Sequence, residues 1–172
     1  MERPRILKSS TPIYFAAISE RGGLELPAYS CGYIDFDEEI LNIGFLKKGT
    51  QIYLNRDMYG LYRIVVEVTS SWSSTDGGGE SDIYIFKNGS GFNTRASSSG
   101  RCSLYLPENY NTATTFYITD LKKDDYIQVL VCAYDDDLSI YDQDARILIE
   151  YISSYGYNNG FGGRIHYRGV IR

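Results

Sequence analysis

The acidic stretch AYDDDLSIYDQDA, residues 133–145, holds the side chains best suited to binding chemistry in this sequence. Carboxylate oxygens are the ligands that Ca²⁺ prefers. The stretch supplies five carboxylates, those of Asp135, Asp136, Asp137, Asp142 and Asp144. Their spacing is not that of an EF-hand, because the turn glycine and the closing glutamate are missing. Two interpretations stay open here, a Ca²⁺ site and a solvated loop between two strands.

Catalytic motifs are nearly absent. The only histidine, His166, lies near the C-terminus, away from the body of the chain, which excludes a histidine-based triad or a histidine-rich metal site there. The sequence contains no GxSxG, HExxH or P-loop motif, and its paired carboxylates fall in predicted loops. We therefore expect a protein that is not an enzyme.

Composition narrows the classes of partner. The chain has 172 residues and a net charge of −5, which argues against a nucleic-acid partner. Its 17 tyrosines suit either protein contacts or strands. The sequence shows no signal-peptide pattern and no apolar run of transmembrane length, so we expect neither export information at Met1 nor membrane insertion.

The three cysteines, Cys31, Cys102 and Cys132, have no zinc-site spacing. One disulfide would leave one thiol over, and the sequence does not say which residues pair. Cys132 lies in the apolar run YIQVLVCAY, where a cysteine is typically a small buried hydrophobic residue.

Strand signals separated by turn residues run through the chain. The predicted strands cover residues 13–19, 32–36, 50–55, 60–72, 81–89, 101–107, 114–121, 125–135 and 145–153. Nine or ten short strands at this spacing predict an all-β sandwich or barrel, with a jelly roll the leading choice. The run FDEEILNIGFL is interpreted as a strand edge and a loop.

Composition also predicts three segments. Residues 1–12 form a basic N-terminal arm, residues 13–152 the β domain, and residues 153–172 an arm rich in Gly, Tyr and Arg. The second arm is either a flexible tail or an extended arm whose anchors are Phe161, Ile165, Tyr167 and Ile171.

The segment GLYRIVVEV, residues 60–68, has large apolar residues on both faces of its predicted strand. A strand in a solitary sandwich buries one face and exposes the other to water. Something other than the chain's own second sheet must therefore cover the second face.

The order of several motifs resembles the globular head of the complement component 1 q subcomponent and the wider tumour-necrosis-factor-like jelly rolls. The matching phrases are IYFAAIS, IDFDEEILN, Gly49 with Gly60 and Tyr62, the Lys87-Asn88-Gly89 hairpin, LKKDDYIQV and RILIEYI. The similarity covers about residues 13–152. The sequence departs from the family in lacking a collagen-like stalk and in having Asp124 where a glycine is usual.

The resemblance implies a compact homotrimer whose subunits bury one sheet against each other. On this basis we expect the trimer interface to include Tyr14, Phe15, Tyr62, Ile64, Val66, Tyr126, Leu130 and Tyr151. Some members of the family bind Ca²⁺ near the trimer apex, which favours the acidic loop as a Ca²⁺ site.

Two functions follow from this reading. The first is a trimeric structural or attachment protein of a virion, such as a capsid, vertex or fibre component, held to neighbouring structural proteins by its basic termini. The second is an extracellular recognition head that binds a receptor, another protein or a glycan through its apex loops.

Overall fold

Thirteen β-strands and no helix make up the regular structure of the described residues in the computed structural model. The described ranges are 13–19, 23–57, 59–72, 80–89, 98–105, 110–134, 137–140 and 144–153. The arms proposed for residues 1–12 and 153–172 fall outside these ranges except for Ser153, as do the tail anchors Phe161, Ile165, Tyr167 and Ile171. Within the described ranges, no helix is long and apolar enough to cross a membrane.

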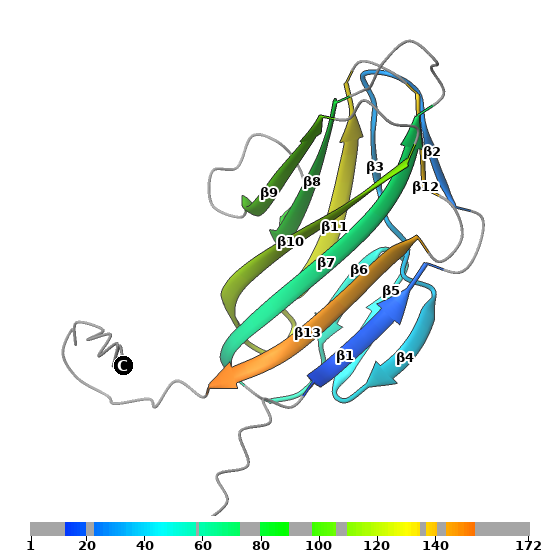
Figure 1. Ribbon diagram of the computed structural model, residues 1–172. Coiled ribbons are helices and arrows are strands. Elements are labelled where there is room, and N and C mark those ends of the chain that lie inside the picture. The colour runs from blue at the N-terminus through cyan, green and yellow to red at the C-terminus, as the bar shows by residue number, and fades with distance from the viewer. Residues whose placement is uncertain are drawn as a thin grey trace, which may run out of the picture.

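The strands form two antiparallel sheets that face each other (Figure 1). The sheet built around the longest strand, here called the β7 sheet, contains β1 (Ile13–Ile18), β2 (Leu24–Leu26), β4 (Glu38–Asn42), β7 (Gly60–Trp72), β10 (Tyr110–Leu121), β12 (Leu138–Ile140) and β13 (Ala145–Ser153). The second, called the β11 sheet, contains β3 (Cys31–Tyr33), β5 (Phe45–Lys48), β6 (Gln51–Leu54), β8 (Glu80–Lys87), β9 (Ser98–Tyr105) and β11 (Tyr126–Ala133).

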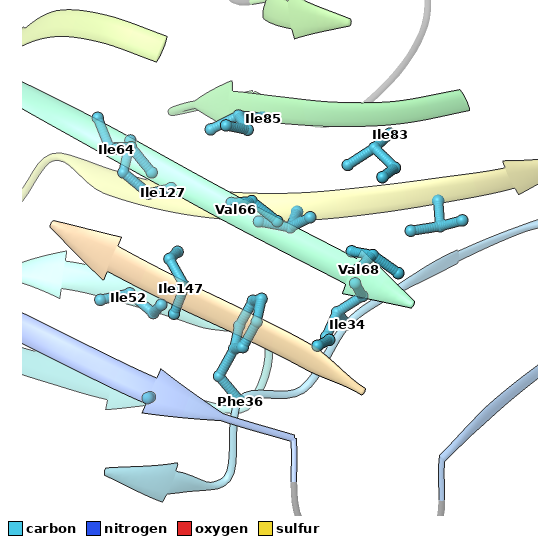
Figure 2. Packing of buried hydrophobic residues seen from close by; sticks show 14 of the residues in the cluster. Ile34, Phe36, Ile52, Ile64, Val66, Val68, Ile83, Ile85, Ile127 and Ile147 are labelled. Atoms are coloured by element: carbon cyan, nitrogen blue, oxygen red, sulfur yellow. The ribbon is translucent and has the colours of Figure 1, made fainter. Parts of the chain in front are cut away.

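The core fills the space between the two sheets. Side chains alternate between the faces of a strand, so every second residue of β7 points inward. Ile64, Val66 and Val68 of β7 meet Ile127 of β11 and Ile85 of β8 in this layer (Figure 2). All of these side chains are buried within a single chain.

Two of the strands that the sequence did not predict come from the run FDEEILNIGFL. It forms β4 in the β7 sheet and β5 in the β11 sheet, so the chain changes sheets between them. Gly44 makes this change, with a φ of 89° that favours glycine, and the side-chain oxygen of Asn42 accepts a hydrogen bond from Phe45 N at 3.0 Å. The interpretation as a strand edge and a loop is wrong, because the break is a single turn.

The β10–β7 pair is the longest ladder in the fold. Its register runs without a break from Tyr110 opposite Ser71 to Leu121 opposite Gly60. On its other side β7 pairs with β13 and, at its end, with β12. In the described part of the chain β10 pairs with β7 alone in this sheet, which makes β10 an edge strand.

Candidate functional site

The outer face of the β7 sheet carries an apolar row that crosses four strands. Phe116 of β10 lies opposite Val65 of β7, Val65 lies opposite Leu148 of β13, and Leu148 lies opposite Ala16 of β1. Residues opposite one another on neighbouring strands have adjacent side chains. The four residues, called the apolar row below, therefore form a continuous strip that points away from the core.

Large apolar side chains at and beside this row are open to solvent. Phe116 is 63% exposed, Ile118 on the same strand 47%, and Ile40 on β4 65%. Soluble monomers rarely gather exposed apolar side chains in this way, and such patches mark interaction surfaces. This face is therefore the best candidate for a functional surface in the described residues.

Two ion pairs flank the apolar row. On one side Arg63 of β7 pairs with Glu150 of β13. On the other side Arg146 of β13 pairs with Glu67 of β7, with 3.7 Å between Nη1 and Oε1. Each of the two strands thus carries one charge of each sign, and the uncharged residues Val65 and Leu148 lie between the two pairs.

The face is also hollowed. A depression of about 270 Å³ lies over β1, β4, β7 and β13. Its lining is mainly apolar and includes Ala16, Ile18, Ile40, Val65 and Leu148, together with the Glu67–Arg146 pair. We call it the hollow below.

Four of the predicted interface residues lie on the wrong face. Phe15, Tyr62, Ile64 and Val66 are buried between the sheets of a single chain, where a neighbouring chain does not reach them. Successive side chains of a strand point to opposite faces of the sheet. A prediction that is off by one residue therefore assigns the core-facing residues to the outer face. The outward residues of β7 are instead Arg63, Val65 and Glu67 and their neighbours at odd positions.

The other four predicted interface residues lie in two different places. Tyr126 and Leu130 belong to β11, in the opposite sheet. Tyr14 and Tyr151 are half-buried against the core, and their ring centroids are 5.7 Å apart. The ring centroid of Tyr151 also lies 5.2 Å from that of Tyr62. The predicted set therefore does not form one surface.

The tyrosine cluster has a role inside the sandwich. Burial and, after it, the nearby Tyr151 and Tyr14 together raise the pKa of Tyr62 to about 12. Gly60 allows the ring of Tyr151 to lie here, because a Cβ atom at position 60 would meet that ring and would lie 2.7 Å from the backbone oxygen of Ser153. This cluster stabilises one end of the fold.

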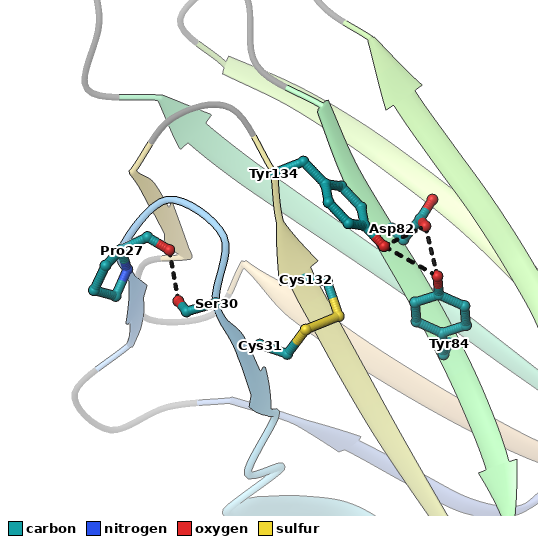
Figure 3. Close-up of a disulfide and its surroundings, with 7 residues drawn as sticks. All are labelled: Pro27, Ser30, Cys31, Asp82, Tyr84, Cys132 and Tyr134. Carbon is teal, nitrogen blue, oxygen red and sulfur yellow. Dashed lines mark hydrogen bonds between the residues drawn. A yellow bond between two sulfur atoms is a disulfide. The ribbon is translucent and has the colours of Figure 1, made fainter. Parts of the chain in front are cut away.

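A second, smaller cluster of buried apolar side chains lies on the outer face of the β11 sheet. Figure 3 shows Cys132, Tyr84 and Tyr134 of this cluster. A disulfide joins Cys31 of β3 to Cys132 of β11. Cys132 is buried, which confirms the prediction from its apolar run. Beside it, the carboxylate of Asp82 accepts hydrogen bonds from the hydroxyls of Tyr84 at 2.6 Å and Tyr134 at 2.9 Å. Burial, followed by the bond to Asp82, raises the pKa of Tyr84.

The proposed Ca²⁺ loop is only partly within the described residues. Asp137 accepts a hydrogen bond from the backbone N of Ala28 at 2.9 Å, and the backbone oxygen of Asp144 accepts one from Thr69. Asp135, Asp136 and Asp142 lie outside the described ranges. Among the residues that are described, no three acidic, histidine or cysteine side chains gather as a metal site would require. The Ca²⁺ site stays a prediction.

A polar network joins two turns that the sequence had singled out as family motifs. The carboxylate of Asp125 accepts hydrogen bonds from the side chain of Asn88 and from the backbone N of Lys122 at 3.0 Å, and it lies 3.4 Å from Lys87 Nζ. Lys87 also donates to the backbone oxygen of Asp120 at 2.6 Å. These bonds hold the Lys87–Gly89 turn against the turn that leads into β11.

Comparison with proteins of known structure identifies the fold. No family model and no curated protein matches this sequence. The crystal structure of murine APRIL at pH 5.0 matches with a TM-score of 0.60 and 15% identity, over 82% of this chain and 100% of that one. The structure of Eiger TNF from S. frugiperda matches with a TM-score of 0.55 and 11% identity, over 87% and 99%. The chain therefore has a tumour-necrosis-factor-like jelly-roll fold, which confirms the fold that its motif order predicted.

Proposed function

We propose that this protein works without catalysis as a homotrimer, and that the outer face of the β7 sheet is the surface on which its copies associate. The observation that carries the proposal is the apolar row, with the exposed Phe116 at its end and the hollow beside it. Burying apolar surface contributes about 25 cal/mol per Å². A face of this kind gains free energy when a second copy covers it.

The trimeric state rests on the family resemblance together with the shape of this face. An exposed edge strand lies next to a hollowed sheet face, and these are two different surfaces. Contact between two different surfaces is heterologous, and such contacts produce closed rings when the rotation between copies closes. A ring of three copies is the state that the resemblance implies.

The proposed setting is a structural or attachment role in a virion, with an extracellular recognition head as the second candidate. The Cys31–Cys132 disulfide supports a location outside the cytosol. It fits both settings, because virion surfaces and secreted proteins both keep disulfides. The partners would be neighbouring structural proteins in the first setting and a receptor or glycan in the second.

The association surface is tested by placing a charge on it. Leu148→Asp puts a carboxylate in the centre of the apolar row, and we expect the trimer to dissociate into folded monomers because a carboxylate loses its hydration when buried without a partner. Leu46→Asp is the matched control, since Leu46 is exposed on the other sheet. Light scattering after size-exclusion chromatography measures the mass, and a Leu148→Asp variant that stays trimeric would overturn the proposed surface.

The two settings are separated by deleting the C-terminal segment 154–172. If the protein is a virion component held by this arm, the shortened chain should still form trimers but should no longer enter the particle, as seen by electron microscopy. If it is a recognition head, the deletion should change nothing, while substitutions within residues 70–80 or 135–144 should remove binding to target cells.

A further inference from the structure

Phe116 and the hollow lie on the same face of the sheet but on different strands. Phe116 belongs to the edge strand β10, whereas the hollow extends over β7, β13 and β1 to Ile40 on β4. Phe116 does not line the hollow of its own chain, and 63% of its surface is exposed. The chain thus presents a projecting aromatic ring and, separately, an apolar depression.

The two features match in size and chemistry. A cavity of about 150 Å³ lined by apolar side chains is large enough to hold a benzene ring. The hollow is about 270 Å³ and open on one side, and its walls are mainly the aliphatic side chains of Ala16, Ile18, Ile40, Val65 and Leu148. An aromatic ring that leaves water for such a depression gains the free energy of apolar burial without leaving a polar group unpaired.

We propose that the ring of Phe116 from one copy occupies the hollow of the next copy around the trimer. The inference rests on the proposed homotrimer and names the contact that holds it together. Ile118, two residues along the same edge and 47% exposed, enters the interface beside it. Glu67 and Arg146, which line the hollow, form an ion pair within one chain. The incoming ring therefore meets no unpaired charge there.

The charges of this face favour a neutral apolar occupant, and a second copy of this chain offers one. Ion pairs on both sides of the row are already closed within one chain, so a neutral apolar edge is the complement that leaves each pair intact. The edge formed by Phe116 and Ile118 carries Thr114 beside it and no charge until Asp120. The chain therefore supplies its own complement.

Photo-crosslinking tests the contact directly. The photoreactive residue p-benzoylphenylalanine replaces Phe116, and the labelled chain is mixed with ¹⁵N-labelled native chain before irradiation. We expect crosslinks from position 116 to ¹⁵N peptides that contain residues 13–19, 38–42 or 145–153. Crosslinks to other segments of the neighbouring copy, or only within the same chain, would overturn the proposed contact.

A double-mutant cycle provides a second measurement that does not need the photoreactive residue. Phe116→Ala removes the ring and Ile40→Trp fills the hollow from within its own chain, and each should raise the dissociation constant on the order of thirtyfold. Because both changes break the same contact, the double variant should lose much less than the product of the two effects. Leu46→Ala and Leu46→Trp serve as controls and should leave the dissociation constant unchanged.

The outcomes separate the contact from the trimer itself. Independent, fully multiplicative effects of Phe116→Ala and Ile40→Trp in a native trimer would overturn the contact and leave the homotrimer standing. A native chain that remains monomeric at all concentrations would instead overturn the proposed function, and the contact would fall with it.

Discussion

At the scale of single residues, Asp125 shows how a buried charge holds the fold together. Burial alone would raise the pKa of its carboxyl. The hydrogen bonds from the Lys122 backbone and from Asn88, together with the charge of Lys87, outweigh burial and lower that pKa below its usual value. A lowered pKa in the folded state means that the carboxylate contributes stability above the unfolded pKa of about 4, and that this stability is lost as the pH falls through the lower folded value.

Asp125→Asn should therefore lower the free energy of unfolding at pH 7 by about 1–3 kcal/mol, because an amide cannot accept all of these bonds. The difference from the native protein should shrink when the same urea titration is repeated at pH 3. Asp124→Asn is the control, since it removes the same charge from an exposed neighbouring residue. Equal effects of the two variants at pH 7 would contradict the role given to Asp125.

At the scale of elements, two neighbouring residues of strand β13 point to opposite faces of the β7 sheet. Ile147 points into the core and is buried, whereas Leu148 points outward in the apolar row. Ile147→Ala should lower the free energy of unfolding by about 2–4 kcal/mol through the lost transfer energy and the cavity left behind. Leu148→Ala should lower it by under 1 kcal/mol in the isolated chain while it weakens association.

Chemical unfolding of dilute protein and sedimentation at higher concentration measure these two effects separately. If Leu148→Ala destabilised the fold as much as Ile147→Ala does, the outward orientation of Leu148 would be wrong.

The disulfide gives a second prediction at this scale, because it ties the short strand β3 to β11 across 101 residues of sequence. Replacing Cys31 and Cys132 by alanine should lower the free energy of unfolding by about 2–5 kcal/mol, since closing a long loop restricts the unfolded chain. Peptide mapping without reduction should recover Cys31 bonded to Cys132. A bond from Cys31 to Cys102 instead would contradict this pairing.

The elements also show how far the sequence alone could lead. The residues of 60–68 indicated correctly that both faces of β7 carry large apolar side chains, although the outward face mixes Val65 with Arg63 and Glu67. The sequence could not say which alternate set faces the core, because both sets of β7 contain large aliphatic residues. The strands β2 and β12 were missed since three residues are too few to show a period.

At the scale of the whole molecule, the order of motifs was enough to predict the jelly roll. The distribution of strands between two sheets was not, because the sheet change at Gly44 and the pairing of β3 with β11 depend on contacts distant in sequence. The hollow was equally beyond reach, since it is formed by four strands that lie far apart along the chain. The sequence indicates that an apolar sheet face must be buried against something. The shape of that face depends on the tertiary structure.

In the proposed homotrimer, three copies of this chain cover each other's apolar faces. Sedimentation equilibrium of the native protein over a hundredfold range of concentration tests it most directly. We predict a species of three times the 19.5 kDa chain mass that persists at micromolar concentration. A mass of 19.5 kDa throughout that range would contradict the account.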